Sequence, residues 1–111
     1  MYLVFDIGGT KMRIAATEDL QKFGEPKVLP TPQSFYEGIE LFNTACKELS
    51  EGRDIKGVAG GIAGPLNKEK TMMVKSPNIS HWADKPLKAE LEKAFGAPVH
   101  LENDAALVGL G

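Results

Sequence analysis

Several features are scarce in this sequence, and each scarcity excludes a class of protein. Only one cysteine, Cys46, is present, which excludes an internal disulfide and a cysteine-rich zinc site. The formal charge of −2 gives no excess positive charge to attract nucleic acid or an anionic membrane. The apolar run at residues 1–5 is short and leads directly into Asp6, unlike a signal peptide or a membrane span. We therefore expect a cytoplasmic protein with no nucleic-acid or membrane partner.

The remaining composition is that of an ordinary globular domain. Apolar residues make up 42% and charged residues 25% of the 111 residues. A chain of this length buries roughly two-thirds of the surface that its unfolded form exposes. We find no internal repeat, low-complexity tract or linker, so we predict one domain over residues 1–111.

The first third of the chain predicts strands. Residues 2–6 and 12–17 are rich in strand-forming residues and are separated by a short glycine-containing stretch, which predicts an antiparallel hairpin. Residues 21–29 could add a third strand, although Gly24 and Pro26 weaken it.

A helix is predicted next. Ser34 and Glu37 have the spacing of a capping box, and the segment ends at Gly52. Apolar residues recur at intervals of three and four, as expected for a helix with one face on a sheet; they are Phe35, Ile39, Phe42, Cys46 and Leu49. On this stripe Cys46 is interpreted as an inert core thiol.

The second half alternates between strands and helices. We predict a buried strand at residues 55–62, a short strand at 71–74 that pairs back across a turn at 67–70, a helix over 84–96 and a strand at 99–102. The Ala-rich residues after that strand begin another helix. Together with the opening hairpin, this order predicts an α/β protein with a mixed sheet covered by helices.

The segment D-I-G-G-T-K suits a phosphate group. Gly8 and Gly9 follow a strand and lack a Cβ, so backbone N–H groups can approach an anion closely. Thr10 adds a hydroxyl and Lys11 a positive charge, and Asp6 offers a hard oxygen for Mg²⁺ or its bound water. The spacing alone leaves an ordinary hairpin turn open as the alternative.

The segment E-N-D-A suits the handling of a hydroxyl. Asn103 and Asp104 lie where a predicted strand meets a predicted helix, the position at which ligand sites of α/β proteins gather. Asp104 could accept a proton from a substrate hydroxyl, and the Asn103 amide could hold neighbouring hydroxyls. The alternative is that the pair simply caps the last helix.

The four motifs D-I-G-G-T-K, G-I-A-G-P, S-P-N-I-S-H-W and E-N-D-A occur in this order along the chain. In this combination the sequence resembles the amino-terminal domain of the ROK family of sugar kinases, which are related to bacterial glucokinases. The resemblance implies the ribonuclease H-like fold of the actin, hexokinase and Hsp70 superfamily. It also implies that ATP, with Mg²⁺, binds in a cleft between two such domains and phosphorylates a hexose hydroxyl.

The resemblance also implies roles for individual residues. Asp104 corresponds to the catalytic base, Asn103 to a sugar ligand, and Asp6 to the acid on the magnesium side, acting through water. The residues that correspond to the first ATP phosphate loop are Gly8, Gly9, Thr10 and Lys11. The residues that would border the sugar are Asn78, Gly64 and Pro65, for which structural turn roles are equally open.

Four further residues receive less specific interpretations. Trp82 is interpreted as a packing residue rather than a stacking platform. His100 is expected to be structural or to face solvent, and Lys70 to belong to a solvated surface. Glu102 is either a neighbour of the site or a surface charge, with the surface charge slightly favoured.

The family's kinases carry a carboxy-terminal domain with the adenosine site, further sugar ligands and a zinc motif, none of which this sequence contains. We therefore expect the chain to be the amino-terminal half of a kinase, inactive without that partner domain. Because five residues precede Asp6, a DNA-binding repressor is disfavoured.

Two alternatives remain open: a stand-alone, non-catalytic domain that binds a sugar or phosphate or docks onto another subunit, and an acyl-phosphate-forming kinase of the same superfamily. The identity of the sugar is open. So is the assembly of homo-oligomers through an exposed apolar face.

Overall fold

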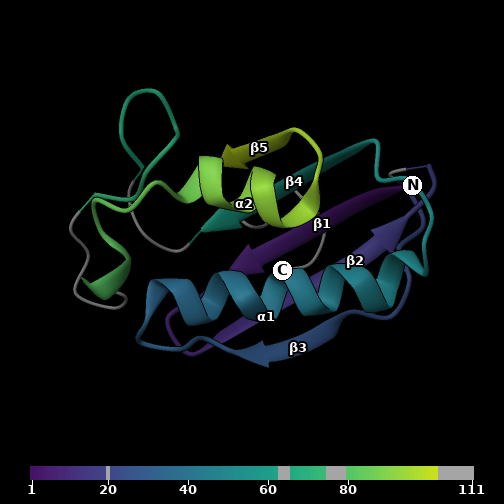
Figure 1. Ribbon diagram of the computed structural model, residues 1–111, viewed down its shortest axis with the longest axis horizontal. Coiled ribbons are helices and arrows are strands. Elements are labelled where there is room, and N and C mark those ends of the chain that lie inside the picture. Colours follow the sequence, from purple (N-terminus) through teal and green to yellow (C-terminus); the bar gives the residue numbers. More distant parts are fainter. Residues whose placement is uncertain (20, 63–65, 75–79, 103–111) are drawn as a thin grey trace.

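The computed structural model describes residues 1–19, 21–62, 66–74 and 80–102. Within them, five strands form one sheet in the order β3-β2-β1-β4-β5, with both α-helices in front of it (Figure 1). The elements in chain order are β1 Tyr2–Ile7, β2 Lys11–Thr17, β3 Lys27–Pro30, α1 Phe35–Ser50, β4 Gly57–Ile62, the 3₁₀ turn η1 Ser80–Trp82, α2 Leu87–Phe95 and β5 Val99–Glu102.

The sheet is mixed, as the sequence predicts. β1 pairs with β2, and β2 with β3, in antiparallel fashion, whereas β1, β4 and β5 run parallel to one another. The opening hairpin is therefore confirmed, and the carboxyl ends of the three parallel strands meet at one edge of the sheet. Ligand sites of α/β proteins lie at this kind of edge.

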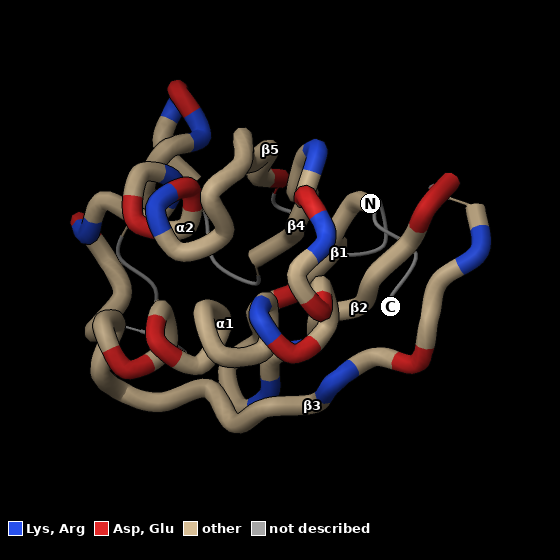
Figure 2. The backbone as a smooth tube through the Cα atoms, turned by 45° about the vertical axis from the view of Figure 1, so that its right-hand side comes forward, with Lys and Arg blue, Asp and Glu red and all other residues tan. Residues whose placement is uncertain are grey.

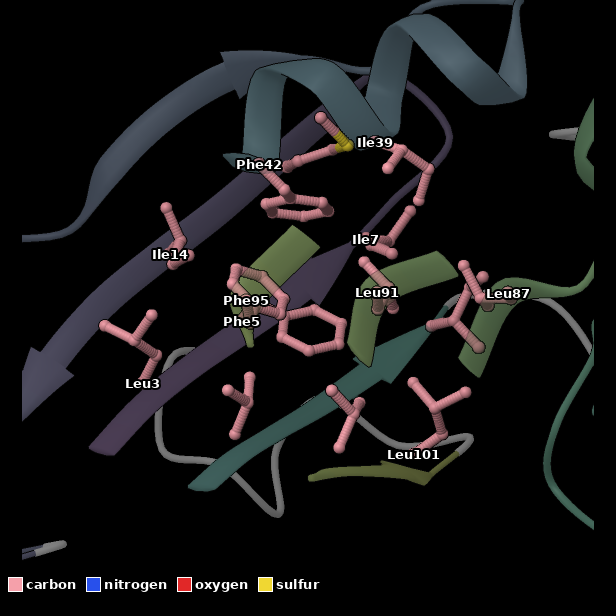
Figure 3. Close-up of a cluster of buried hydrophobic side chains, with 14 of the residues drawn as sticks. Leu3, Phe5, Ile7, Ile14, Ile39, Phe42, Leu87, Leu91, Phe95 and Leu101 are labelled. Atoms are coloured by element: carbon pink, nitrogen blue, oxygen red, sulfur yellow. The ribbon is translucent and has the colours of Figure 1, made fainter. Parts of the chain in front are cut away.

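One face of the sheet carries the main core. Because strand side chains alternate between faces, Leu3, Phe5 and Ile7 of β1 point toward the helices. The Phe5 ring lies 5.3 Å from the Phe42 ring of α1 and 6.1 Å from the Phe95 ring of α2, measured between centroids (Figure 3). These aromatic contacts fix both helices to the middle of the sheet.

The predicted helix is confirmed as α1. The Ser34 side chain accepts a hydrogen bond from the Glu37 N–H at 3.4 Å, so Ser34 is the N-cap. The helix ends where Glu51 takes a left-handed conformation with φ of 50°. Cys46 is buried in the core, and burial raises the pKa of its thiol. The interpretation of Cys46 as an inert core residue is therefore confirmed.

The third strand is shorter than predicted. Residues 21–29 do not form one strand, because β3 begins only at Lys27. Phe23 makes a single bridge with Thr17, and Pro26, which lacks an N–H, separates that bridge from β3. Residues 21–26 therefore connect β2 to β3 without forming a sheet strand of their own. Leu20 lies outside the described residues.

The prediction of a strand at residues 71–74 is also wrong, although the turn predicted at residues 67–70 is present. Leu66 and Met73 form an isolated bridge, and the Asn67 N–H donates to the Met72 carbonyl at 2.9 Å. The Asn67 side chain in turn accepts the N–H groups of Thr71 and Met72. These amides are satisfied by a side chain, so no regular ladder forms.

The remaining elements follow the sequence closely. α2 begins at Leu87, after Pro86, and ends at Gly96, which takes the left-handed conformation with φ of 66°. β5 occupies the predicted range. The helix predicted after it lies outside the described residues.

Charged residues of both signs are interspersed along the backbone in Figure 2. Neither α1 nor α2 of the described chain has the length and apolar character needed to cross a membrane.

Candidate functional site

A row of residues crosses the sheet at the carboxyl ends of its parallel strands. Asp6 of β1 lies beside Gly61 of β4, and Gly61 lies beside Glu102 of β5. Leu3, Phe5 and Leu101 face the helices, so by alternation Asp6 and Glu102 point to the opposite face. Gly61 places no side chain between the two carboxylates.

The charged form of Asp6 is destabilised by its surroundings. Its side chain is half-buried, and this burial raises the pKa of its carboxyl. The charge of Arg13, its cross-strand partner, and a hydrogen bond from the Arg13 backbone N–H oppose that rise only in part. A carboxylate in this condition gains from a cation placed beside it.

The turn after Asp6 is shaped by its first glycine. The Gly8 N–H donates to the Lys11 carbonyl at 2.9 Å. A Cβ on Gly8 would lie 3.1 Å from that oxygen, so a larger residue would crowd the turn. Among the described residues, the N–H groups of Gly9 and Thr10 have no hydrogen-bond acceptor. They are therefore the loop amides available to an anion.

The same turn is braced from β3. The Thr31 hydroxyl donates to the Gly8 carbonyl at 2.8 Å, and the Thr31 N–H donates to the Thr10 carbonyl at 3.0 Å. The next residue, Pro32, accepts the indole N–H of Trp82 at 2.9 Å. Two motifs some seventy residues apart in sequence are thus connected through two residues that follow β3.

Trp82 has a packing role, as predicted. Its side chain is 1% exposed and meets the Phe35 ring edge-on. A Cβ on Gly38 would lie 2.4 Å from the indole, so glycine at this position of α1 makes room for the ring. Trp82 anchors the chain that follows the S-P-N-I-S-H segment to the start of α1.

Both carboxylate oxygens of Glu102 interact with a basic side chain. The Lys70 ammonium lies 2.7 Å from Oε2, and His100 Nε2 lies 2.8 Å from Oε1. The hydrogen bond from Lys70, followed by that from His100, lowers the pKa of Glu102. The interpretation of Lys70 as part of a solvated surface is confirmed, because its side chain is 47% exposed, and its partner there is Glu102. The two interpretations of Glu102, a neighbour of the site or a surface charge, stay predictions. The expectation that His100 faces solvent is confirmed, because its side chain is 70% exposed.

The predicted site residues divide into two groups. Asp6, Gly8, Gly9, Thr10 and Lys11 come together at the β1–β2 turn. The others lie outside the described residues; they are Gly64, Pro65, Asn78, Asn103 and Asp104. Within the described ranges, no three His, Cys, Asp or Glu side chains gather as a ready metal site.

Sequence reasoning missed Arg13, Thr31 and the Lys70–Glu102 pair. Arg13 could have been found by counting the register outward from the two-residue turn, which pairs position 6 with position 13. Thr31 and Lys70 reach their partners across 23 and 32 residues, respectively. No local pattern signals contacts at such separations.

We expect the Asp6→Asn variant to gain stability over the natural protein as the pH rises from about 3.9 through the pKa of folded Asp6. A raised pKa means that the folded state binds the proton more tightly, so the fold loses stability when that proton leaves. Asparagine has no such proton, so at neutral pH the variant should unfold at the same or a higher temperature. Thermal unfolding between about pH 4 and pH 7 tests this.

Asp19→Asn is the control with the opposite sign. The N–H groups of Lys22 and Gln21 lower the pKa of Asp19, so its contribution is present above the unfolded pKa and is lost as the pH falls. Asp19→Asn should therefore be less stable at neutral pH. An Asp6→Asn variant that loses stability with rising pH would contradict the assigned environment of Asp6.

A mixed five-stranded sheet that opens with an antiparallel hairpin, with the D-I-G-G-T-K turn at the carboxyl edge of its parallel strands, is the amino-terminal part of the actin/hexokinase-like fold. The chain belongs to the ROK family, whose model matches residues 2–111.

Relatives and solved structures agree with this assignment. The chain is 31% identical to a glucokinase of Streptomyces coelicolor over 96% of its own length and 33% of the relative's. It is 37% identical to an N-acetyl-D-glucosamine kinase of Citrobacter koseri over 95% of its own length and 35% of the relative's.

Among solved structures, a ROK glucokinase of Streptomyces griseus in complex with glucose and AMPPNP superposes with a TM-score of 0.81 and 31% identity, covering 94% of this chain and 33% of that one. A ROK hexokinase of Thermus thermophilus gives 0.80, also at 31% identity, covering 94% and 35%. The chain thus spans about a third of the length of these relatives.

Proposed function

We propose that the protein is an ATP-dependent sugar kinase that transfers a phosphoryl group from ATP to a hexose hydroxyl, and that residues 1–111 form its amino-terminal domain. Membership of the ROK family supports a sugar kinase, since its similar members include a glucokinase and an N-acetyl-D-glucosamine kinase. The single structural observation that carries the proposal is the Asp6–Lys11 turn at the carboxyl edge of three parallel strands.

The chemistry of the turn fits a magnesium nucleotide. Gly9 and Thr10 offer amides without acceptors among the described residues, and Lys11 is exposed beside them. The half-buried Asp6 carboxylate would hold Mg²⁺ through water and would lose its electrostatic cost in doing so. A magnesium ion bound there neutralises phosphate charge that develops during transfer. The assigned ATP-binding residues are Asp6, Gly8, Gly9, Thr10 and Lys11.

We assign the binding and activation of the acceptor sugar to residues that follow β4 and β5 in the sequence. Asn103 and Asp104 come directly after Glu102, which lies two strands from Asp6, or roughly 10 Å at the usual spacing between strands. We assign Asp104 as the general base for the sugar hydroxyl and Asn103 as a sugar ligand. Gly64 and Pro65, just after β4, and Asn78 would border the sugar.

The transfer step then depends on positioning and charge. Phosphoryl transfer passes through a loose transition state that requires little covalent chemistry from the protein. Asp104, ionised near neutral pH, accepts the hydroxyl proton as the oxygen becomes phosphorylated. A carboxy-terminal domain closing over this edge would supply the adenosine site and the remaining sugar contacts.

The test is a phosphorylation assay on the natural protein at its full length, with ATP, Mg²⁺ and a panel of hexoses that includes glucose and N-acetylglucosamine. We expect ATP-dependent formation of a hexose phosphate. Carboxylic acids in the same panel would reveal an acyl-phosphate-forming kinase, and sugar or phosphate binding without turnover would support a non-catalytic domain. The intact mass of the natural protein shows whether a second domain accompanies residues 1–111.

A further inference from the structure

Thr31, which lies outside the phosphate loop, hydrogen-bonds to carbonyl groups of the loop and leaves the loop amides to point elsewhere. Thr31 uses two donors on two of these carbonyls: its hydroxyl on Gly8 at 2.8 Å and its N–H on Thr10 at 3.0 Å. Both donors belong to one residue, so they move together. The two acceptors lie two residues apart on either side of Gly9.

Because peptide units are planar, these two hydrogen bonds to carbonyl groups also set the direction of the N–H groups that follow them. In a trans peptide unit the C=O of one residue and the N–H of the next point in opposite directions within a rigid plane, and no described peptide bond is cis. When Thr31 draws the Gly8 and Thr10 carbonyls toward itself, the N–H groups of Gly9 and Lys11 point away from it. Of these two, the Gly9 N–H is among the loop amides without an acceptor in the described residues, so Thr31 fixes the direction of an amide that is available to phosphate.

Thr31 is itself fixed in place. It directly follows β3, whose Pro30 pairs with Lys11 of β2. The next residue, Pro32, accepts the Trp82 indole N–H at 2.9 Å, and Trp82 is fully packed against the start of α1. The hydroxyl is thus held between the sheet and the helix layer, and the side chain of Thr31 is partly buried.

We propose that Thr31 is a positioning residue of the phosphate loop, which aims the amide of Gly9 at a phosphate group of the bound nucleotide. This inference rests on the proposed function. It assigns the specific task of orienting a donor to a residue outside the D-I-G-G-T-K segment. Oriented backbone donors act strongly on phosphate charge because they need no reorganisation during the reaction.

The experiment compares Thr31→Val, Thr31→Ser and Thr44→Val in the full-length protein. Valine keeps the shape and the backbone N–H but removes the hydroxyl, whereas serine keeps the hydroxyl. Thr44 is exposed on α1 and serves as a matched control. We expect Thr31→Val to lower kcat/KM for ATP by about tenfold, with KM for the sugar within about twofold. Thr31→Ser and Thr44→Val should stay near the natural protein.

A second readout does not require turnover. Titration of pyrophosphate with Mg²⁺, followed by amide NMR, should shift the Gly9 signal in the natural protein and in Thr31→Ser, and shift it less in Thr31→Val. Natural protein that shows this shift without phosphorylating any sugar would overturn the proposed function but support the role of Thr31. Equal behaviour of Thr31→Val and natural protein, equal losses in both Thr31 variants, or no response of the Gly9 amide would overturn the inference.

Discussion

Replacing Asp104 by asparagine is expected to lower turnover of the full-length protein by about 10²-fold or more, while sugar binding is retained. Asparagine has nearly the same size and can still hydrogen-bond a hydroxyl, but it cannot accept the proton that leaves when the oxygen is phosphorylated. In the sequence, Asp104 comes two residues after Glu102, and Glu102 lies at the edge of the sheet that also carries Asp6. Steady-state kinetics with ATP and the preferred hexose, together with calorimetric sugar binding, measure both parts of this expectation.

Asp84→Asn is a suitable control for that measurement. Asp84 is exposed, precedes α2, and takes a left-handed conformation with φ of 60°, which asparagine adopts readily. It should leave kinetics and binding unchanged. Comparable turnover in Asp104→Asn and the natural protein would remove Asp104 from the role of base. Loss of sugar binding with unchanged turnover at saturation would instead make Asp104 a ligand.

The parts of the fold that local patterns determine were predictable. The opening hairpin follows from two strand-like runs around a short glycine turn, and α1 follows from a capping serine and a repeating apolar stripe. Both signals arise from contacts within a few residues. The alternation of strands and helices predicted a mixed sheet, but it did not predict which strands pair in parallel, because β1, β4 and β5 are distant in sequence.

The failures have a common physical cause. Residues 21–29 and 71–74 have strand-like composition, yet a proline in one and the Asn67 side chain in the other remove the regular backbone ladder. Composition reports the preference of side chains for a strand environment, whereas strand formation also requires partners for the backbone.

The residues of the candidate site could be named from the sequence, whereas the contacts that hold them in place could not. The residue types of D-I-G-G-T-K predict a phosphate loop from the sequence alone. In contrast, the hydrogen bonds of Thr31 to Gly8 and Thr10, and of Lys70 to Glu102, depend on how distant segments pack. Arg13 is the intermediate case, since its position beside Asp6 follows from the hairpin register.

The glycines of β4 provide the largest expected effect on stability. Gly60 pairs with Phe5 across the β1–β4 ladder, and a Cβ on Gly60 would lie only 2.2 Å from the Phe5 ring. That ring cannot move aside, because Phe42 and Phe95 confine it from the helix layer (Figure 3). The ring therefore occupies the space above the strand that a side chain at position 60 would need.

We expect Gly60→Ala to lower the free energy of unfolding by about 3 kcal/mol, at the upper end of the usual cost of overpacking a core. Gly57→Ala on the same strand is the matched control, because its Cβ would meet Tyr2 at an ordinary 3.6 Å. Combining Gly60→Ala with Phe5→Leu should recover part of the loss, since the smaller side chain vacates the contested space. Denaturant unfolding of the natural protein, Gly60→Ala, Phe5→Leu and the double variant measures the coupling, and Gly57→Ala is measured beside them. Equal stability of the two alanine variants would mean that the sheet tolerates a side chain at position 60, and the close packing of Phe5 on Gly60 would then not limit the sequence of β4.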